Sequence, residues 1–185
     1  MARWQGFYEE LAHERYSSLL AYAMAFTGQR ATAEDLVQEA MVRTFSAPRR
    51  LSSAQHAEMY VRRAIANIFV DDARRTAVFK RTEHRLASTQ GHPDHGEAID
   101  EREAITQALA TLSPQLRACI VLRYYDDLAV NEIAHHLKLA TGTVKRYLHD
   151  GSTQLRDLLG AEAPPADTDT ITVTTIDVTP HHGRR

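Results

Sequence analysis

The chain has a single cysteine, Cys119, among its 185 residues, so it cannot form an intrachain disulfide. A lone thiol inside an apolar run is typical of a reducing compartment. No apolar run approaches the roughly 20 residues that a membrane-spanning helix needs. The first residues, MARWQGFYEE, also lack the apolar core of a signal peptide. We therefore expect a cytoplasmic protein with no membrane insertion.

Catalytic motifs are missing as well. The sequence has no phosphate-binding loop, no dinucleotide glycine pattern and no nucleophile elbow. Ten histidines invite a metal site, but His135 and His136 are adjacent on an expected helix and so point in different directions. The acidic pairs fall at expected helix ends, where they are more typical of helix termini than of an acid–base dyad. We expect no enzymatic activity, no cofactor and no metal.

Positive charge is concentrated in one part of a chain whose net charge is −2. Residues 43–81 contain nine basic and three acidic residues, whereas residues 1–42 contain three basic and six acidic ones. A basic segment is often only a solvated face. Here the charge lies on one expected helix and the loop before it, which also suits a phosphate-lined partner such as a nucleic acid.

Apolar residues recur near 3.6-residue spacing throughout, which predicts an all-α protein. The first helix is expected over residues 5–26, with Gly28 in the left-handed conformation after its end. A second helix, AEDLVQEAMVRTF, follows with Thr32 as its N-cap. A loop over residues 46–58 then precedes a third helix, MYVRRAIANIFVDDARR, over residues 59–75.

A change in composition divides the chain. Residues 82–100 contain glycine and proline with almost no apolar residues, which predicts a flexible linker between an N-terminal domain, 1–81, and a C-terminal domain, 101–160. Residues 161–185 are rich in Thr, Asp and Pro and are interpreted as a disordered tail. The tail is either inert or holds the two domains together until a signal arrives.

The stretch DLAVNEIAHHLKLATGTVKRYLHDGSTQLR, residues 127–156, predicts two helices joined by a tight turn. Thr141 is expected to cap the second of them. Polar and basic side chains face outward from this second helix: Thr143, Lys145, Arg146 and His149. A helix-turn-helix needs such a face to enter a major groove, although an ordinary helical hairpin would show the same pattern.

Taken in order, these motifs resemble a bacterial RNA polymerase sigma factor of the extracytoplasmic-function (ECF) group. The acidic helix AEDLVQEAMVRTF, the basic helix containing YVRR, the linker and the C-terminal stretch containing GTVK carry the resemblance over about residues 5–159. YVRR and GTVK are similar to the motifs of actinobacterial forms. GTVK also occurs in other helix-turn-helix regulators, so the ordered set is what is specific. The resemblance implies a factor that directs promoter-specific transcription initiation under anti-sigma or signal control.

The resemblance implies two partners, core RNA polymerase and promoter DNA. On the polymerase, the clamp of the largest subunit and the flap of the second subunit are the implied contacts. The helix at residues 33–45 would dock on the clamp. Its candidate contact residues are Asp35, Leu36, Gln38, Glu39 and Arg43.

The resemblance also divides DNA recognition between two elements. The loop and helix at residues 46–75 would read and open the minus-ten element, with Tyr60, Arg62, Arg63, Asn67, Arg74 and Arg75 as candidates. The second helix of the helix-turn-helix would read the minus-thirty-five element as duplex, with Thr141, Thr143, Lys145, Arg146 and His149 as candidates. Tyr60 or Phe69 could stack on a base, but aromatic residues at helical spacing usually pack in a core.

Two positions depart from the family pattern. Asp150 stands where these factors usually carry a basic residue, and a carboxylate facing phosphates lowers affinity, although it could accept a hydrogen bond from a cytosine. Gly151 next to it lowers helix propensity by about 1 kcal/mol relative to alanine. Both predict weaker duplex binding.

Other functions are compatible with parts of the pattern. A free-standing helix-turn-helix regulator would bind an operator without polymerase, but it has no need of the polar face at residues 33–45. A helical adaptor that does not bind DNA would be indifferent to loss of the basic side chains. A zinc enzyme would require bound metal in stoichiometric amount.

Overall fold

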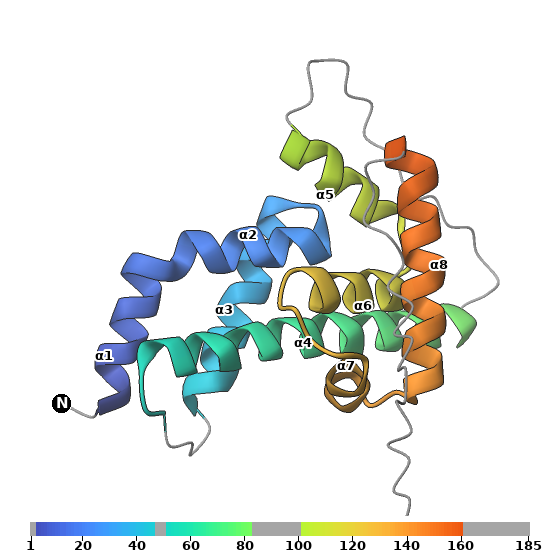
Figure 1. Cartoon of the computed structure of the whole chain (residues 1–185). Helices are drawn as coiled ribbons and strands as arrows, with labels where there is room; N and C mark the ends of the chain where they lie inside the picture. The colour runs from blue at the N-terminus through green and yellow to red at the C-terminus, as the bar shows by residue number, and fades with distance from the viewer. Residues whose placement is uncertain (1–2, 47–50, 83–100, 161–185) are drawn as a thin grey trace, which may run out of the picture.

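The structure, a computed structural model, describes residues 3–46, 51–82 and 101–160, and within these ranges it contains helices and no strands. The elements in chain order are α1 Arg3–Glu10, the π-helical η1 Leu11–Arg15, α2 Tyr16–Thr27, α3 Arg30–Ser46, α4 Ala54–Thr82, α5 Glu101–Thr111, α6 Pro114–Tyr124, α7 Val130–Leu137 and α8 Thr141–Leu159 (Figure 1). The all-α prediction is confirmed. The predicted linker, apart from Thr82, and the predicted tail lie outside the described residues.

The N-terminal helices pack around one apolar core. Leu19 and Phe26 of α2, Val37 of α3 and Ile65 of α4 are essentially inaccessible to solvent. The expected first helix bends at the π-helical turn η1, between α1 and α2 (Figure 1), and Leu11 of this turn lies in the core. Gly28 ends α2 with a left-handed φ of 69°, as predicted, and its N–H donates to the Met24 carbonyl.

The C-terminal helices pack around α6. Ser113 is the N-cap of α6, and Pro114 takes the first helical position, where its missing N–H costs no hydrogen bond. Gly151 of α8 is buried against α6, where an added Cβ would lie 2.9 Å from Cγ1 of Ile120. The glycine that weakens the helix by propensity therefore allows α8 to approach α6 closely.

Three local predictions are wrong. Thr32 lies inside α3 instead of capping it. Thr141 is the first residue of α8, because Ala140 takes the extended N-cap conformation and its carbonyl accepts from Thr143 and Val144. The loop expected over residues 46–58 ends early, since α4 begins at Ala54 and the Ser53 hydroxyl accepts a hydrogen bond from the His56 N–H at 3.1 Å.

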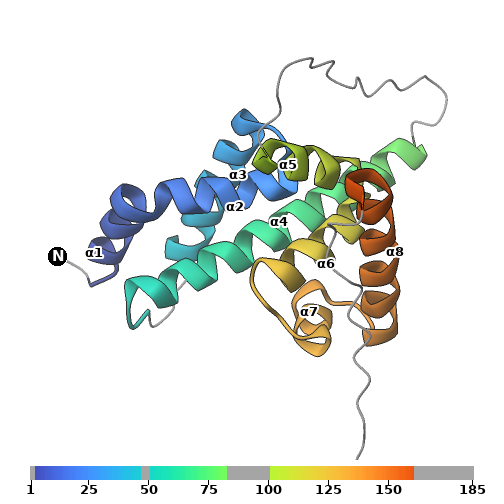
Figure 2. The ribbon, with the colours of Figure 1, turned by 45° about the horizontal axis from the view of Figure 1, so that its top comes forward.

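The two groups of helices lie directly against each other. Helix α4 runs along both of them, between α2 and α3 on one side and α6 and α7 on the other (Figure 2). Helix α2 also contacts α5 and α6. None of the described helices is both long and apolar enough to cross a membrane.

Candidate nucleic-acid and protein-binding faces

One stripe of α4 carries four of the six candidate minus-ten residues. Tyr60, Arg63, Asn67 and Arg74 are three, four and seven residues apart, so they share one face of the helix. The first three line a cavity of about 650 Å³ whose opposite wall is α7. The Tyr60 ring, the Asn67 amide and the Arg63 guanidinium thus line one cavity. An aromatic ring can stack on a base, an amide can bond to a base edge, and a guanidinium can bind a phosphate.

Arg62 points to a different side of α4. Its guanidinium pairs with Glu58 at 2.7 Å and with Asp126, from the α6–α7 turn, at 3.4 Å. It also lies 5.3 Å from the centre of the Tyr22 ring, within cation–π range. Arg62 therefore lies apart from Tyr60 and Asn67, and it lines a second cavity together with Arg63.

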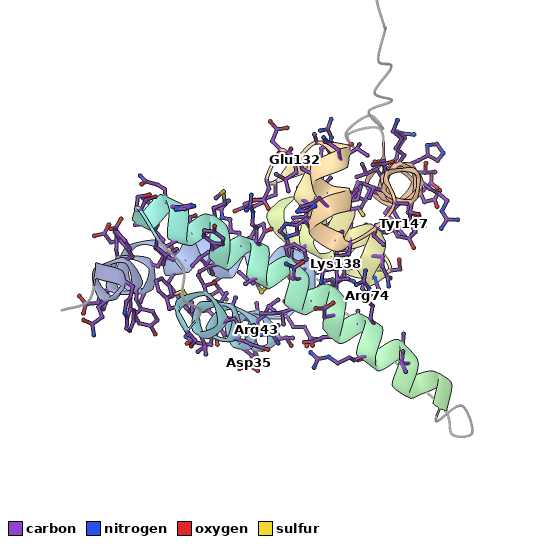
Figure 3. The ribbon with its side chains drawn as sticks, turned by 90° about the horizontal axis from the view of Figure 1, so that it is seen from below. Asp35, Arg43, Arg74, Glu132, Lys138 and Tyr147 are labelled. Atoms are coloured by element: carbon purple, nitrogen blue, oxygen red, sulfur yellow. The ribbon has the colours of Figure 1, made fainter. Side chains whose placement is uncertain are left out.

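The two arginines near the end of α4 also have protein partners. Arg74 donates to the Leu137 carbonyl at the end of α7, at 3.0 Å, and lies 3.6 Å from Asp71. In Figure 3, Arg74 lies beside Lys138 where α7 ends. Arg75 is exposed and pairs with Asp72. Neighbouring carboxylates thus reduce the positive charge that the sequence count alone indicated.

The two aromatic candidates have different environments. Phe69 packs against Phe26 with ring centres 5.4 Å apart and lies under the guanidinium of Arg117, so it belongs to the core. Tyr60 is half-buried, with its ring 4.9 Å from that of His56 and 6.0 Å from the Arg63 guanidinium. Only Tyr60 lines the cavity, so it is the better candidate for stacking.

Helix α3 exposes a mixed face beside α4, where Figure 3 shows Asp35 and Arg43, and Arg43 also lines the cavity between α4 and α7. Asp35, Gln38, Glu39 and Arg43 are exposed, and Glu39 pairs with Arg43 at 2.5 Å. The fifth candidate, Leu36, is only 6% exposed, which corrects its assignment as a surface contact. Its position on the apolar stripe directs it into the core instead.

Sequence reasoning missed an apolar residue on this α3 face. Val42 is 61% exposed and lies three residues after Glu39, on the same side of the helix. The ring of the nearby Phe45 packs against those of Trp4 and Tyr8, with ring centres 6.3 and 5.4 Å apart. Val42 lies four residues after Gln38 and three after Glu39, so helical spacing alone could have placed it on this face.

The N-terminal part of α8 presents its candidates to solvent. Thr141, Lys145, Arg146 and His149 are exposed, Thr143 is half-buried, and Val144 between them is buried. Lys138 takes a left-handed φ of 54° in the turn between α7 and α8, and that turn sets the angle between the two helices. Asp150 is half-buried at the edge of this face. The arrangement is that of a helix-turn-helix with its second helix available to a groove.

Family models match both halves of the chain. Residues 11–78 match the model of Sigma-70 region 2, and residues 102–155 match that of Sigma-70, region 4. The ECF RNA polymerase sigma factor SigL of Mycobacterium tuberculosis is 35% identical over 151 residues, which cover 79% of this chain and 85% of the relative. The chain belongs to the ECF sigma factors.

Further comparisons agree with this family. The RNA polymerase sigma-E factor of Streptomyces coelicolor is 28% identical over 159 residues, covering 83% of this chain and 86% of the relative. The sigma factor RpoE of Bartonella quintana, solved in complex with the anti-sigma factor NepR, is 22% identical with a TM-score of 0.59. That likeness covers 85% of this chain and 99% of the other, and it shows a shared fold.

This sigma factor is therefore a transcription initiation factor that binds core RNA polymerase and directs it to promoters. The α4 stripe lies within the region 2 match, and the α8 face lies within the region 4 match. No group of three or more His, Cys, Asp or Glu in the described parts of the chain is placed to hold a metal ion. His136 instead lies 3.3 Å, through Nε2, from the Arg63 carbonyl, and burial lowers its pKa.

Proposed function

We propose that this sigma factor opens promoter DNA with the α4 stripe and reads duplex DNA with α8. The observation that carries the proposal is the convergence of Tyr60, Arg63 and Asn67 on one cavity. A base leaving the duplex would stack on the Tyr60 ring and present its edge to the Asn67 amide. Arg63 and Arg74 would hold the phosphates of the separated strand, with Arg62 and Arg75 at its margins.

Helix α8 would read the minus-thirty-five element from the major groove. Lys145 and Arg146 are exposed and directly follow the buried Val144, so the packing of Val144 fixes where they extend from the helix. Thr141, Thr143 and His149 add hydrogen-bonding groups along the same face. Asp150 at its edge would limit the affinity or select a cytosine.

The α3 face would dock on the clamp of the largest polymerase subunit. Asp35, Gln38, Glu39 and Arg43 offer charged and polar groups, and Val42 adds an apolar contact at the edge of this set. Apolar side chains enclosed by polar ones are typical of protein interfaces. The C-terminal domain, residues 101–160, would bind the flap of the second subunit.

An anti-sigma protein is a further proposed partner. The Bartonella relative of similar fold was solved with one. Such a protein would either separate the N-terminal domain, 1–81, from the C-terminal domain or hold the two domains together. Because it binds core polymerase, this sigma factor would act in the cytoplasm.

Reconstitution with bacterial core polymerase on fragmented genomic DNA tests the proposal. Sequencing of the transcript starts should reveal two short upstream elements at a constant spacing. Duplex binding without any starts would favour a protein that acts at operators without polymerase. Loss of the starts with Lys145→Ala/Arg146→Ala, but not with Arg156→Ala on the same helix, would link the upstream element to the N-terminal half of α8.

A further inference from the structure

The cavity between α4 and α7 is lined by polar groups from three helices. Arg43 comes from α3, Glu132 comes from α7, and Tyr60, Arg63 and Asn67 come from α4. In Figure 3, α4 runs between Arg43 and Glu132. The volume of about 650 Å³ lies within the range of roughly 300–1,000 Å³ that is typical of sites for small ligands. The cavity can therefore hold a small molecule between groups of opposite charge.

Apolar side chains line the same cavity beneath its polar groups. Ala64 and Ile68 of α4 and Leu128, just before α7, all pack against the core. Small-ligand sites commonly combine such an apolar surface with a few polar groups that fix orientation. The half-buried ring of Tyr60 adds an aromatic face, and the amide of Asn67 can donate to and accept from the edge of a base. An asparagine amide matches adenine best, since it meets N6 and N7 together.

Two guanidinium groups add positive charge to the cavity. Arg43 bonds to Glu39 through one nitrogen at 2.5 Å, and a guanidinium has five N–H donors, so others can reach a ligand. Arg63 is exposed, and its guanidinium lies 6.0 Å from the centre of the Tyr60 ring. A phosphate attached to a nucleoside that stacks on Tyr60 would therefore meet a cation, with which it forms strong charge-assisted hydrogen bonds.

Glu132 is the group that a DNA strand does not explain. Its Oε2 accepts a hydrogen bond from the Ala129 N–H at 2.8 Å, which fixes the side chain at the first turn of α7. An ionised carboxylate has about four acceptor positions, so this bond leaves others for a ligand. The carboxylate repels DNA phosphates, whereas the 2′-hydroxyl of a ribose can donate to it. Acidic side chains bind ribose in this way in dinucleotide-binding folds.

We propose that this cavity binds a free ribonucleoside phosphate, with adenine as the preferred base. The adenine stacks on the Tyr60 ring and pairs with the Asn67 amide. Glu132 accepts the hydrogen bond of the ribose 2′-hydroxyl, and Arg43 and Arg63 bind the phosphates. The nucleotide and a promoter strand then use the same ring and the same amide. Only this last consequence rests on the proposed function of the α4 stripe.

Calorimetric titration of the full chain with ADP, in a buffer without divalent cations, tests the site. ADP should bind about tenfold more tightly than 2′-deoxy-ADP, because the deoxyribose leaves the carboxylate without its donor. Adenosine, which lacks the phosphates, should bind at least about tenfold more weakly than ADP. Absence of ADP binding, or equal affinities for ADP and 2′-deoxy-ADP, would overturn the proposal. Equal affinities for ADP and CDP would overturn the preference for adenine.

Glu132→Gln tests the ribose contact, and Glu103→Gln is its matched control. Glutamine can keep the hydrogen bond to the backbone at the start of α7, so the helix is retained. The preference for ADP over 2′-deoxy-ADP should fall from about tenfold to at most about twofold, because a neutral amide oxygen is a weaker acceptor. Glu103 is exposed on α5, and its variant should keep the full preference. An unchanged preference in Glu132→Gln would remove the carboxylate from the site.

Transcription assays separate this site from the proposed function. Glu132 is not among the proposed contacts to DNA or polymerase, so Glu132→Gln should keep the transcript starts of the reconstituted system. Asn67→Ala should weaken ADP binding about tenfold as well as impair strand opening. Loss of opening with unchanged ADP binding would show that the nucleotide does not use the amide. If the unaltered protein binds ADP with a ribose preference but gives no starts, the proposed function fails and the site stands. Starts without ADP binding would have the reverse meaning.

Discussion

The two faces proposed to bind DNA, on α4 and on α8, carry similar side chains in different surroundings. On α4, Arg62 and Arg74 are engaged by carboxylates and carbonyls of the protein itself. On α8, Lys145 and Arg146 directly follow a buried valine, Val144, and are exposed to solvent. Charge alone therefore does not define a nucleic-acid surface; its availability depends on which other helix lies against it.

The difference matches the order of events that initiation requires. A face that reads duplex DNA can be exposed at all times, because duplex DNA is present before opening. A face that captures single strands is useful only after opening, and its aromatic and cationic groups would otherwise bind any single-stranded nucleic acid.

The largest effect is expected from the exposed face. Lys145→Ala/Arg146→Ala should weaken binding to promoter duplex by roughly 100-fold, because two cationic contacts are lost, and should reduce the salt slope by about two. Fluorescence anisotropy over a range of salt concentrations measures both. Arg156→Ala, near the other end of α8, is the control and should leave the slope unchanged. An equal slope for the double variant and the control would place the recognition surface elsewhere.

A substitution at Gly151 should disturb the support of the same face. Gly151→Ala places a methyl group 2.9 Å from Ile120, so it should lower the free energy of unfolding by about 1–3 kcal/mol. Gly142→Ala, in open space on the same helix, should instead raise it by about 0.5–1 kcal/mol. Urea unfolding of the two variants compares them directly. Opposite signs would confirm that packing against α6, and not helix propensity, determines the need for glycine at 151.

A substitution of Asn67 tests the role of the α4 stripe. Asn67→Ala should slow strand opening by about tenfold, because a base edge loses its hydrogen-bonding partner. Permanganate reactivity of unpaired thymines on a promoter measures opening, and native gels measure polymerase binding, which should not change. Asp35→Ala on α3 should have the opposite pattern: it should weaken polymerase binding more than it slows strand opening. Equal loss of opening and polymerase binding in Asn67→Ala would make the residue structural.

The smallest effect concerns pH. Burial lowers the pKa of His136 below its usual 6.5, with the charges of Arg63 and His135 acting in the same direction, while the hydrogen bond to Arg63 and the charge of Asp126 oppose it. The contact between α7 and α4 is therefore fully stable above pH 6.5 and weakens as pH falls through 6.5 towards the lowered pKa. Amide exchange over α4 should rise in that window. His136→Gln should flatten the profile, whereas His149→Gln, on the exposed face of α8, should leave it intact.

The sequence predicted the helices well wherever a local pattern decides them. Ser113 and Pro114 begin α6, and Gly28 ends α2, because each residue acts on its own backbone. Leu36 was misplaced because the family pattern named it a contact, although its helical position directs it inward. Ser53 was missed as the cap of α4 because the preceding residues read as loop, although its hydroxyl bonds three residues ahead.

The sequence by itself determined the family, the all-α class and the exposed polar stripe of α8, since these depend on the order and spacing of residues along one segment. The tertiary structure decided which basic residues are engaged and which are exposed. Asp126 lies 64 positions from Arg62 and 104 from Tyr22, and Arg117 lies 91 from Phe26. No local pattern encodes such pairs, because they form only when two separately built helical groups bury their surfaces against each other.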